Sequence, residues 1–171
     1  MGQLFNNTFF ILMAYSKKQK LEQPAEFWTA CKLSVKAQPG FKCESPVNDS
    51  ESAHKLIRAV WDNGKLCVQE QMMAFFVCFD KQIVGYHAAF MRTVDRTYGN
   101  PRYILNLALH TLACSVILAH NHPFGSLVPS PADIELTGQI KSALDLIEVK
   151  LVDHLIINEE TYLSMSDEGF M

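Results

Sequence analysis

From Ser50 onward, segments with the apolar spacing of helices alternate with segments typical of β-strands. Helices are expected at 50–63, 100–113 and 130–147, each starting at a capping residue or a proline. Strands are expected at 72–79, 82–90, 115–119 and 150–157, and the first two are close enough in sequence to form a hairpin. This alternation predicts an α/β fold with a mixed sheet covered by helices.

Two finer expectations concern the middle of the chain. The segment 92–99 is polar, which predicts a loop. The helix at 100–113 carries apolar residues on nearly all sides, which predicts that it is buried.

The composition fits a globular protein with one main domain. The chain has 171 residues, of which 49% are hydrophobic and 19% charged. A chain of this length can bury a core without disulfides, and this balance excludes disordered and collagen-like proteins. Turn-forming residues gather at 36–52, which predicts an N-terminal extension of unknown role at 1–49 and a main domain at 50–171.

Charge and cysteine content bear on partners and location. Fifteen basic against eighteen acidic residues leave a net charge of −3, which argues against direct nucleic-acid binding. The early apolar run at 9–15 is too short to span a membrane, and no basic residue precedes it as in a secretory signal. The five cysteines are scattered and form no C-x-x-C pair, which argues against a zinc ribbon and a disulfide framework. We therefore expect most of them to be buried thiols and the protein to be located in the reducing cytoplasm.

The most informative residues follow the strand at 115–119. His120 and His122 lie two apart at the strand end, so their side chains share one face, and Pro123 stops the strand. Ser130 and Asp133 fall in the first turn of the next helix. Two imidazoles and a carboxylate suit Zn²⁺ and leave a fourth position for water, as in catalytic zinc sites.

Structural interpretations of the same residues stay open at this point. Ser130 and Asp133 also fit a helix cap, which is compatible with Asp133 reaching an ion. A zinc hydrolase further needs a general base, and Glu70, just before the first strand, is the best candidate. The alternative for Glu70 is an exposed carboxylate at the end of a strand.

These residues resemble the signature of JAMM/MPN+ metallopeptidases. That signature has an upstream Glu, then H-x-H, seven residues, Ser, two residues and Asp, and the spacing from His120 to Asp133 meets it. The strings at 120–125, 129–133, 153–157 and 164–171 are similar to those of the bacterial RadC family. The resemblance covers about 50–171 and is to a short form, because 1–49 lacks the Gly-rich helix-hairpin-helix of longer members.

The resemblance implies a fold, a cofactor and a reaction. The fold is a three-layer α-β-α sandwich of the cytidine-deaminase-like type. One Zn²⁺ per chain would be bound by His120, His122 and Asp133. Glu70 would activate the attacking water, and Ser130 would donate a hydrogen bond to the oxyanion. The implied reaction is hydrolysis of an amide or isopeptide bond in a peptide or protein substrate.

Three other functions have partial support in the sequence or in the resemblance. The family name suggests a DNA-repair accessory protein with a structural or vestigial zinc site. The string His-Asn-His also occurs in HNH nucleases, but their residues spread over a longer unit, so the match is coincidental. A nucleobase deaminase is disfavoured because its H-x-E and P-C-x-x-C ligands are absent.

Three features complete the prediction. Phe124 stands where the family usually has Ser, and 90–98 lacks the glycines of the family's loop. His154 is expected to pack or hydrogen-bond near the sheet, with a role behind the metal ligands as an alternative.

Overall fold

A computed structural model describes residues 45–92, 97–98, 101–123 and 125–171. The strands form a six-stranded sheet in the order β3-β2-β1-β4-β5-β6. The described helices are α2 (Ser50–Val60), α3 (Asn63–Leu66), α4 (Pro101–Thr111) and α5 (Pro131–Asp145). The strands are β1 (Gln71–Val77), β2 (Ile83–Arg92), β3 (Thr97–Tyr98), β4 (Ser115–Asn121), β5 (Lys150–Ile157) and β6 (Tyr162–Ser164). Apart from its last five residues, the predicted extension at 1–49 lies outside the described residues.

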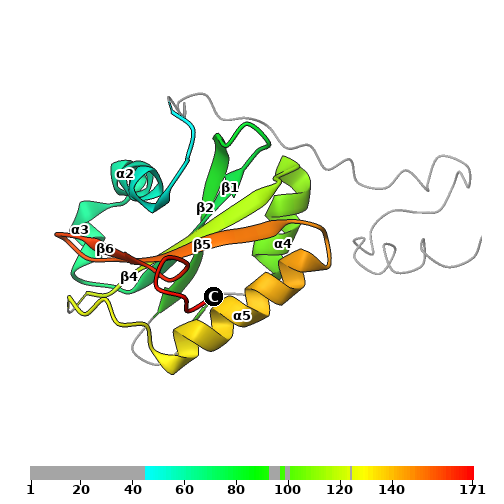
Figure 1. Ribbon diagram of the computed structural model, residues 1–171. Helices are drawn as coiled ribbons and strands as arrows, with labels where there is room; N and C mark the ends of the chain where they lie inside the picture. The colour runs from blue at the N-terminus through cyan, green and yellow to red at the C-terminus, as the bar shows by residue number, and fades with distance from the viewer. Residues whose placement is uncertain (1–44, 93–96, 99–100, 124) are drawn as a thin grey trace, which may run out of the picture. The chain divides into compact units, whose positions relative to one another are not determined.

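Helices cover both faces of the sheet (Figure 1). On one face, α4 and α5 contribute Ile104, Ile140 and Leu144 to a core that includes Leu118 of β4. On the other face, Ile57 of α2 packs in a second core with alternate residues of the same strands. Strand side chains alternate between faces, so an apolar run covered on both sides stays buried. The predicted three-layer α-β-α sandwich is confirmed.

The central strands explain the mixed character of the sheet. β1 pairs antiparallel with β2, as the predicted hairpin, and antiparallel with β4 on its other side. β4 pairs parallel with β5, and α5 connects the two strands. A parallel pair requires such a crossover. The end of β4 therefore lies beside β1, β5 and the start of α5.

Three expectations were wrong in detail. Thr97 and Tyr98 form a short strand paired with β2, where a loop was predicted. α4 is buried on one side only, with Ile104 and Ala108 inside and Leu109 exposed, because a single face of the helix lies against the sheet. The three described cysteines are not buried, because each falls at the end of an element rather than within it. These are Cys67, Cys78 and Cys114, while Cys31 and Cys43 lie outside the described residues.

The helix starts agree with the sequence. Asp49 caps α2 and accepts a hydrogen bond from the backbone N–H of Ser52. Ser130 caps α5, with Pro131 as the first helical residue. Among the described helices, none combines the length and apolar character needed to cross a membrane.

Candidate metal centre

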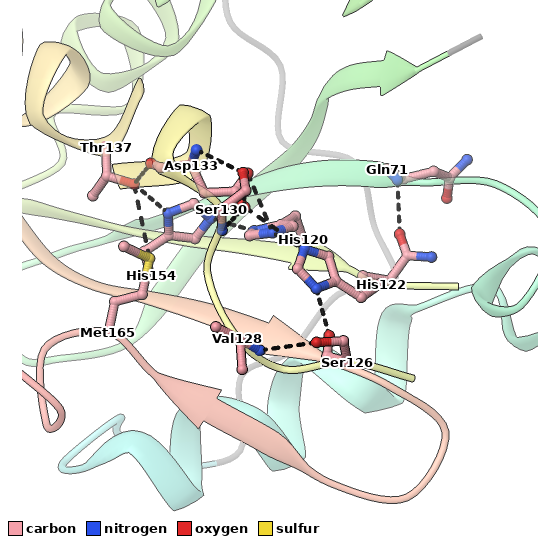
Figure 2. Close-up of polar contacts among 11 residues, drawn as sticks. Gln71, His120, His122, Ser126, Val128, Ser130, Asp133, Thr137, His154 and Met165 are labelled. Carbon is pink, nitrogen blue, oxygen red and sulfur yellow. Dashed lines mark hydrogen bonds and ion pairs between the residues drawn. The ribbon is translucent and has the colours of Figure 1, made fainter. Parts of the chain in front are cut away.

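The two histidines of the H-x-H pattern meet at the end of β4. His120 lies within β4 on the face that α5 covers and is 1% exposed. His122 follows the strand, and its backbone N–H donates to the carbonyl of Ile157 on β5. The two Nε2 atoms lie 2.9 Å apart, and Figure 2 shows both rings beside Asp133. The alternation of a strand thus brings both rings to one point, as expected from the sequence.

Asp133 approaches the histidines from the first turn of α5. Its Oδ1 lies 3.6 Å from His120 Nε2, and its Oδ2 lies 3.7 Å from His122 Nε2. Oδ2 also accepts hydrogen bonds from the backbone N–H and the hydroxyl of Ser130, at 2.8 and 2.7 Å. The predicted capping box is confirmed, and the same carboxylate reaches both imidazoles.

The Nδ1 atom of His122, which points away from His120, has a partner that determines which ring nitrogen carries the hydrogen. Nδ1 contacts the backbone carbonyl of Ser126, which can only accept, so Nδ1 carries a hydrogen. In the neutral ring, Nε2 then presents its lone pair toward His120 and Asp133. A histidine that binds a metal through one ring nitrogen usually donates the hydrogen of its other ring nitrogen to a nearby acceptor.

The three side chains form a group that could hold a metal ion. One ligand atom from each of His120, His122 and Asp133 lies within 4.8 Å of the others. Tetrahedral Zn²⁺ with bonds to nitrogen of 2.0–2.1 Å would set the two Nε2 atoms about 3.3 Å apart. The observed 2.9 Å is close to that separation. The residues fit a zinc ion.

The charges in the group complement a cation. Burial lowers the pKa of His120 to about 4, so this ring is neutral at pH 7. Burial alone would raise the pKa of Asp133, but His122, His120 and Ser130 together hold it well below its usual value. The hydrogen-bonding interaction with Asp133 raises the pKa of His122. A proton on Nε2 of His122 and a metal cation would therefore compete for the same position.

Zinc affinity should therefore depend on pH through His122. The pKa of this ring is raised above 6.5, and the metal must displace its proton. We expect affinity to increase by about tenfold per pH unit below that pKa and to level off above it. Competition against a zinc-binding dye at several pH values measures this. Affinity that already levels off below pH 6.5 would contradict the raised pKa of His122.

Glu70 lies beside this group. Glu70 directly precedes β1, two residues before Met72, which pairs with His120. Its negative charge contributes to the raised pKa of His122. Glu70 is half-buried rather than exposed. The structure thus brings all five predicted site residues to one end of the sheet.

Sequence reasoning missed the role of Asn121, the middle residue of the H-x-H pattern. Its side chain is fully buried on the opposite face of β4. Nδ2 donates to the carbonyls of Leu66 and Gln69 at 2.6 and 2.9 Å, and Oδ1 accepts from the backbone N–H of Gln71 at 2.7 Å. Asn121 therefore ties the segment that carries Glu70 to the strand that carries His120. The sequence did contain a signal for this role, because a polar residue between two candidate ligands at the end of a buried strand needs hydrogen-bond partners.

His154 also hydrogen-bonds near the sheet, as predicted. It is fully buried on β5, and its Nε2 lies 2.7 Å from His120 Nδ1.

The sequence departs from the family pattern at Phe124 and in the segment 90–98. The side chains at these positions lie outside the described residues.

Comparisons with known proteins agree with these features. The model of the RadC-like JAB domain family matches residues 47–170. A UPF0758 protein of Streptococcus sanguinis is 43% identical over 103 residues, which cover 60% of this chain and 45% of that protein. A UPF0758 protein of Marinomonas is 38% identical over 60% of this chain and 46% of its own length. The UPF0758 protein YkfG of Escherichia coli is 34% identical over 60% of this chain and 65% of its own.

The chain spans less than half the length of the streptococcal and Marinomonas relatives. The family match covers the whole segment that carries the H-x-H and Ser-x-x-Asp patterns. The possible metal group formed by His120, His122 and Asp133 fits a JAMM-type domain. The protein is therefore a member of the RadC-like JAB domain family.

Proposed function

We propose that this protein is a zinc-dependent metallopeptidase of the JAMM type. It hydrolyses an amide or isopeptide bond in a peptide or protein substrate, with one Zn²⁺ per chain. The observation that carries the proposal is the arrangement of two imidazole Nε2 atoms 2.9 Å apart, with the carboxylate of Asp133 beside both. Three ligands of this kind are typical of zinc sites that keep a position for water.

His120, His122 and Asp133 would hold the ion. When bound, zinc supplies a Lewis acid and lowers the pKa of a coordinated water to about 7. Glu70 accepts the proton of the attacking water and passes it to the leaving amine. The electrostatic effect of Glu70 on His122, and the hydrogen bonds of Asn121 to the segment that carries Glu70, support this role.

Ser130 stabilises the oxyanion. Its hydroxyl donates to Asp133 Oδ2, and its backbone N–H donates to the same oxygen. Because the backbone contact does not depend on the side chain, the hydroxyl can turn toward a substrate oxygen while Asp133 stays held. A donor of this kind lowers the energy of the tetrahedral transition state.

Ser130→Ala and Ser130→Gly separate this role from helix capping. Both variants lack the hydroxyl, so we expect kcat to fall by about 10²–10³ in each. Alanine at a cap costs about 0.5–2 kcal/mol of unfolding free energy, whereas glycine costs only a few tenths. Kinetics with urea unfolding measures both effects. Unchanged hydrolysis by Ser130→Gly would exclude the oxyanion role.

Metal content and peptide hydrolysis test the proposed function. We expect one zinc per purified chain by elemental analysis, and loss of that zinc in the double variant His120→Ala/His122→Ala. Hydrolysis is sought in a mixture of peptides and Lys-linked isopeptides, with cleavage detected as ¹⁸O from labelled water in the products. Full zinc in the double variant would contradict the site. Zinc binding without any ¹⁸O incorporation would favour an accessory protein with a structural zinc.

A further inference from the structure

We propose that His154 and Thr137 position the metal site by keeping the proton of His120 on Nδ1. Neither residue belongs to the group that could hold the ion. The inference rests on the proposed function, since it concerns how His120 is prepared as a ligand.

Three hydrogen bonds form a chain that runs from His120 into α5 (Figure 2). His120 Nδ1 lies 2.7 Å from His154 Nε2, and His154 Nδ1 lies 2.7 Å from the hydroxyl of Thr137. The Thr137 hydroxyl donates to the backbone carbonyl of Asp133, one helical turn earlier. His154 and Thr137 are 0% and 1% exposed, so the chain is closed to water.

The last acceptor determines the direction of every bond in this chain. A carbonyl oxygen has no hydrogen, so Thr137 must donate its only one to Asp133. The Thr137 oxygen can then only accept, so Nδ1 of His154 carries a hydrogen and donates it. The ring of His154 is fully buried, and its hydrogen-bond partners among the described residues are the Thr137 hydroxyl and the His120 ring, so no carboxylate there holds a second hydrogen on it and its Nε2 is an acceptor. Nδ1 of His120 must therefore donate to it.

The consequence appears on the other side of the His120 ring. With the hydrogen on Nδ1, Nε2 presents a lone pair toward His122 and Asp133, as metal binding requires. The opposite tautomer would place a hydrogen on Nε2, pointing at the site. Binding a cation would then require moving that hydrogen first. Because the chain of hydrogen bonds already keeps the hydrogen on Nδ1, metal binding does not have to supply the free energy of this tautomer change.

The surrounding contacts hold His154 in register. Its backbone N–H donates to Asp153 Oδ1 at 2.7 Å, and its carbonyl accepts from the N–H of Met165 at 3.0 Å. Asp153 also accepts from the hydroxyl of Ser164 and the N–H of Ser166. Met165 is fully buried, with its sulfur 3.9 Å from the Thr137 hydroxyl. These contacts hold the backbone of His154 in place, and Met165 packs against Thr137.

Long-range ¹H–¹⁵N NMR spectra of the imidazoles test the proposal in the metal-free full chain. These spectra distinguish a hydrogen on Nδ1 from one on Nε2. We expect His120 and His154 both to carry the hydrogen on Nδ1. A hydrogen on Nε2 of neutral His120 would overturn the proposal.

Two substitutions at Thr137 extend the test. Thr137→Val removes the acceptor for His154 with little change in shape, so we expect the hydrogens of His154 and His120 to shift toward Nε2. Zinc affinity should fall by about 10–100-fold, as it does when an outer hydrogen-bond partner is lost. Thr137→Ser keeps the hydroxyl and should keep both the tautomers and the affinity.

Substitutions at His154 give an independent comparison. Glutamine can accept the hydrogen of His120 Nδ1 through its carbonyl, whereas leucine cannot, so His154→Gln should bind zinc more tightly than His154→Leu. Equal affinities for these two variants would overturn the proposal.

The outcomes separate this inference from the proposed function. If Thr137→Val keeps the wild-type tautomers and zinc affinity, the positioning role is excluded and the zinc site stands. If Thr137→Val weakens zinc binding but the zinc-loaded wild type hydrolyses no substrate, the positioning role stands and the proposed hydrolase fails.

Discussion

Zinc binding and hydrolysis are both expected to be lost in His120→Ala. This ring is 1% exposed and provides one of three candidate ligands, so its removal leaves only His122 and Asp133. The loss of affinity should exceed the ~10–100-fold that an outer hydrogen-bond partner contributes. Elemental analysis after dialysis, with an activity assay, measures the result.

A matched variant tests whether the effect belongs to the site. His87 is exposed on β2, far along the chain from the H-x-H pattern, and His87→Ala should keep one zinc per chain and wild-type activity. Circular dichroism of His120→Ala checks that the sheet is intact despite the cavity. A folded His120→Ala protein that retains full zinc would place the metal elsewhere.

Glu70→Gln should have the second-largest effect on hydrolysis, but unlike His120→Ala it should leave zinc binding intact. Glutamine is similar in size to glutamate but cannot accept the proton of the attacking water, so we expect kcat to fall by about 10²–10⁴. Zinc content should stay at one per chain, because Glu70 is not among the three candidate ligands. Kinetics of the loaded enzyme with elemental analysis gives both values.

A second readout of Glu70→Gln does not depend on a substrate. The charge of Glu70 contributes to the raised pKa of His122, so its removal should lower the pH at which zinc affinity levels off. Glu160→Gln, a change at an exposed position after β5, should leave both properties unchanged. Wild-type kcat in Glu70→Gln would remove Glu70 from the mechanism.

Much of the site could be predicted because its signals are local. The alternation of side chains along a strand is enough to bring His120 and His122 together. A Ser-x-x-Asp pattern before an apolar helix predicts both the cap and the direction of the carboxylate. The main helices and the long strands followed in the same way from apolar spacing within short windows.

The remaining features depend on contacts between distant segments. Thr137 has the pattern of an ordinary helical residue, and only the packing of α5 on β5 brings it to His154. Asn121 reaches carbonyls more than fifty residues earlier in the chain. β3 has only two residues, which is too short for any periodicity to be detected. The one-sided burial of α4 likewise reflects which neighbour it has, not its own composition.

The contacts of Asn121 have a further consequence for how this site tolerates motion and sequence change. Its amide joins the backbone segment that carries Glu70 to the strand that carries His120, so we expect the proposed proton acceptor and the candidate metal ligands to keep their relative positions. Neighbouring loops can then vary in length or sequence without altering the alignment of the reacting groups. Substitutions at the rim of the site would then change which substrates fit and leave the geometry at its centre as it is.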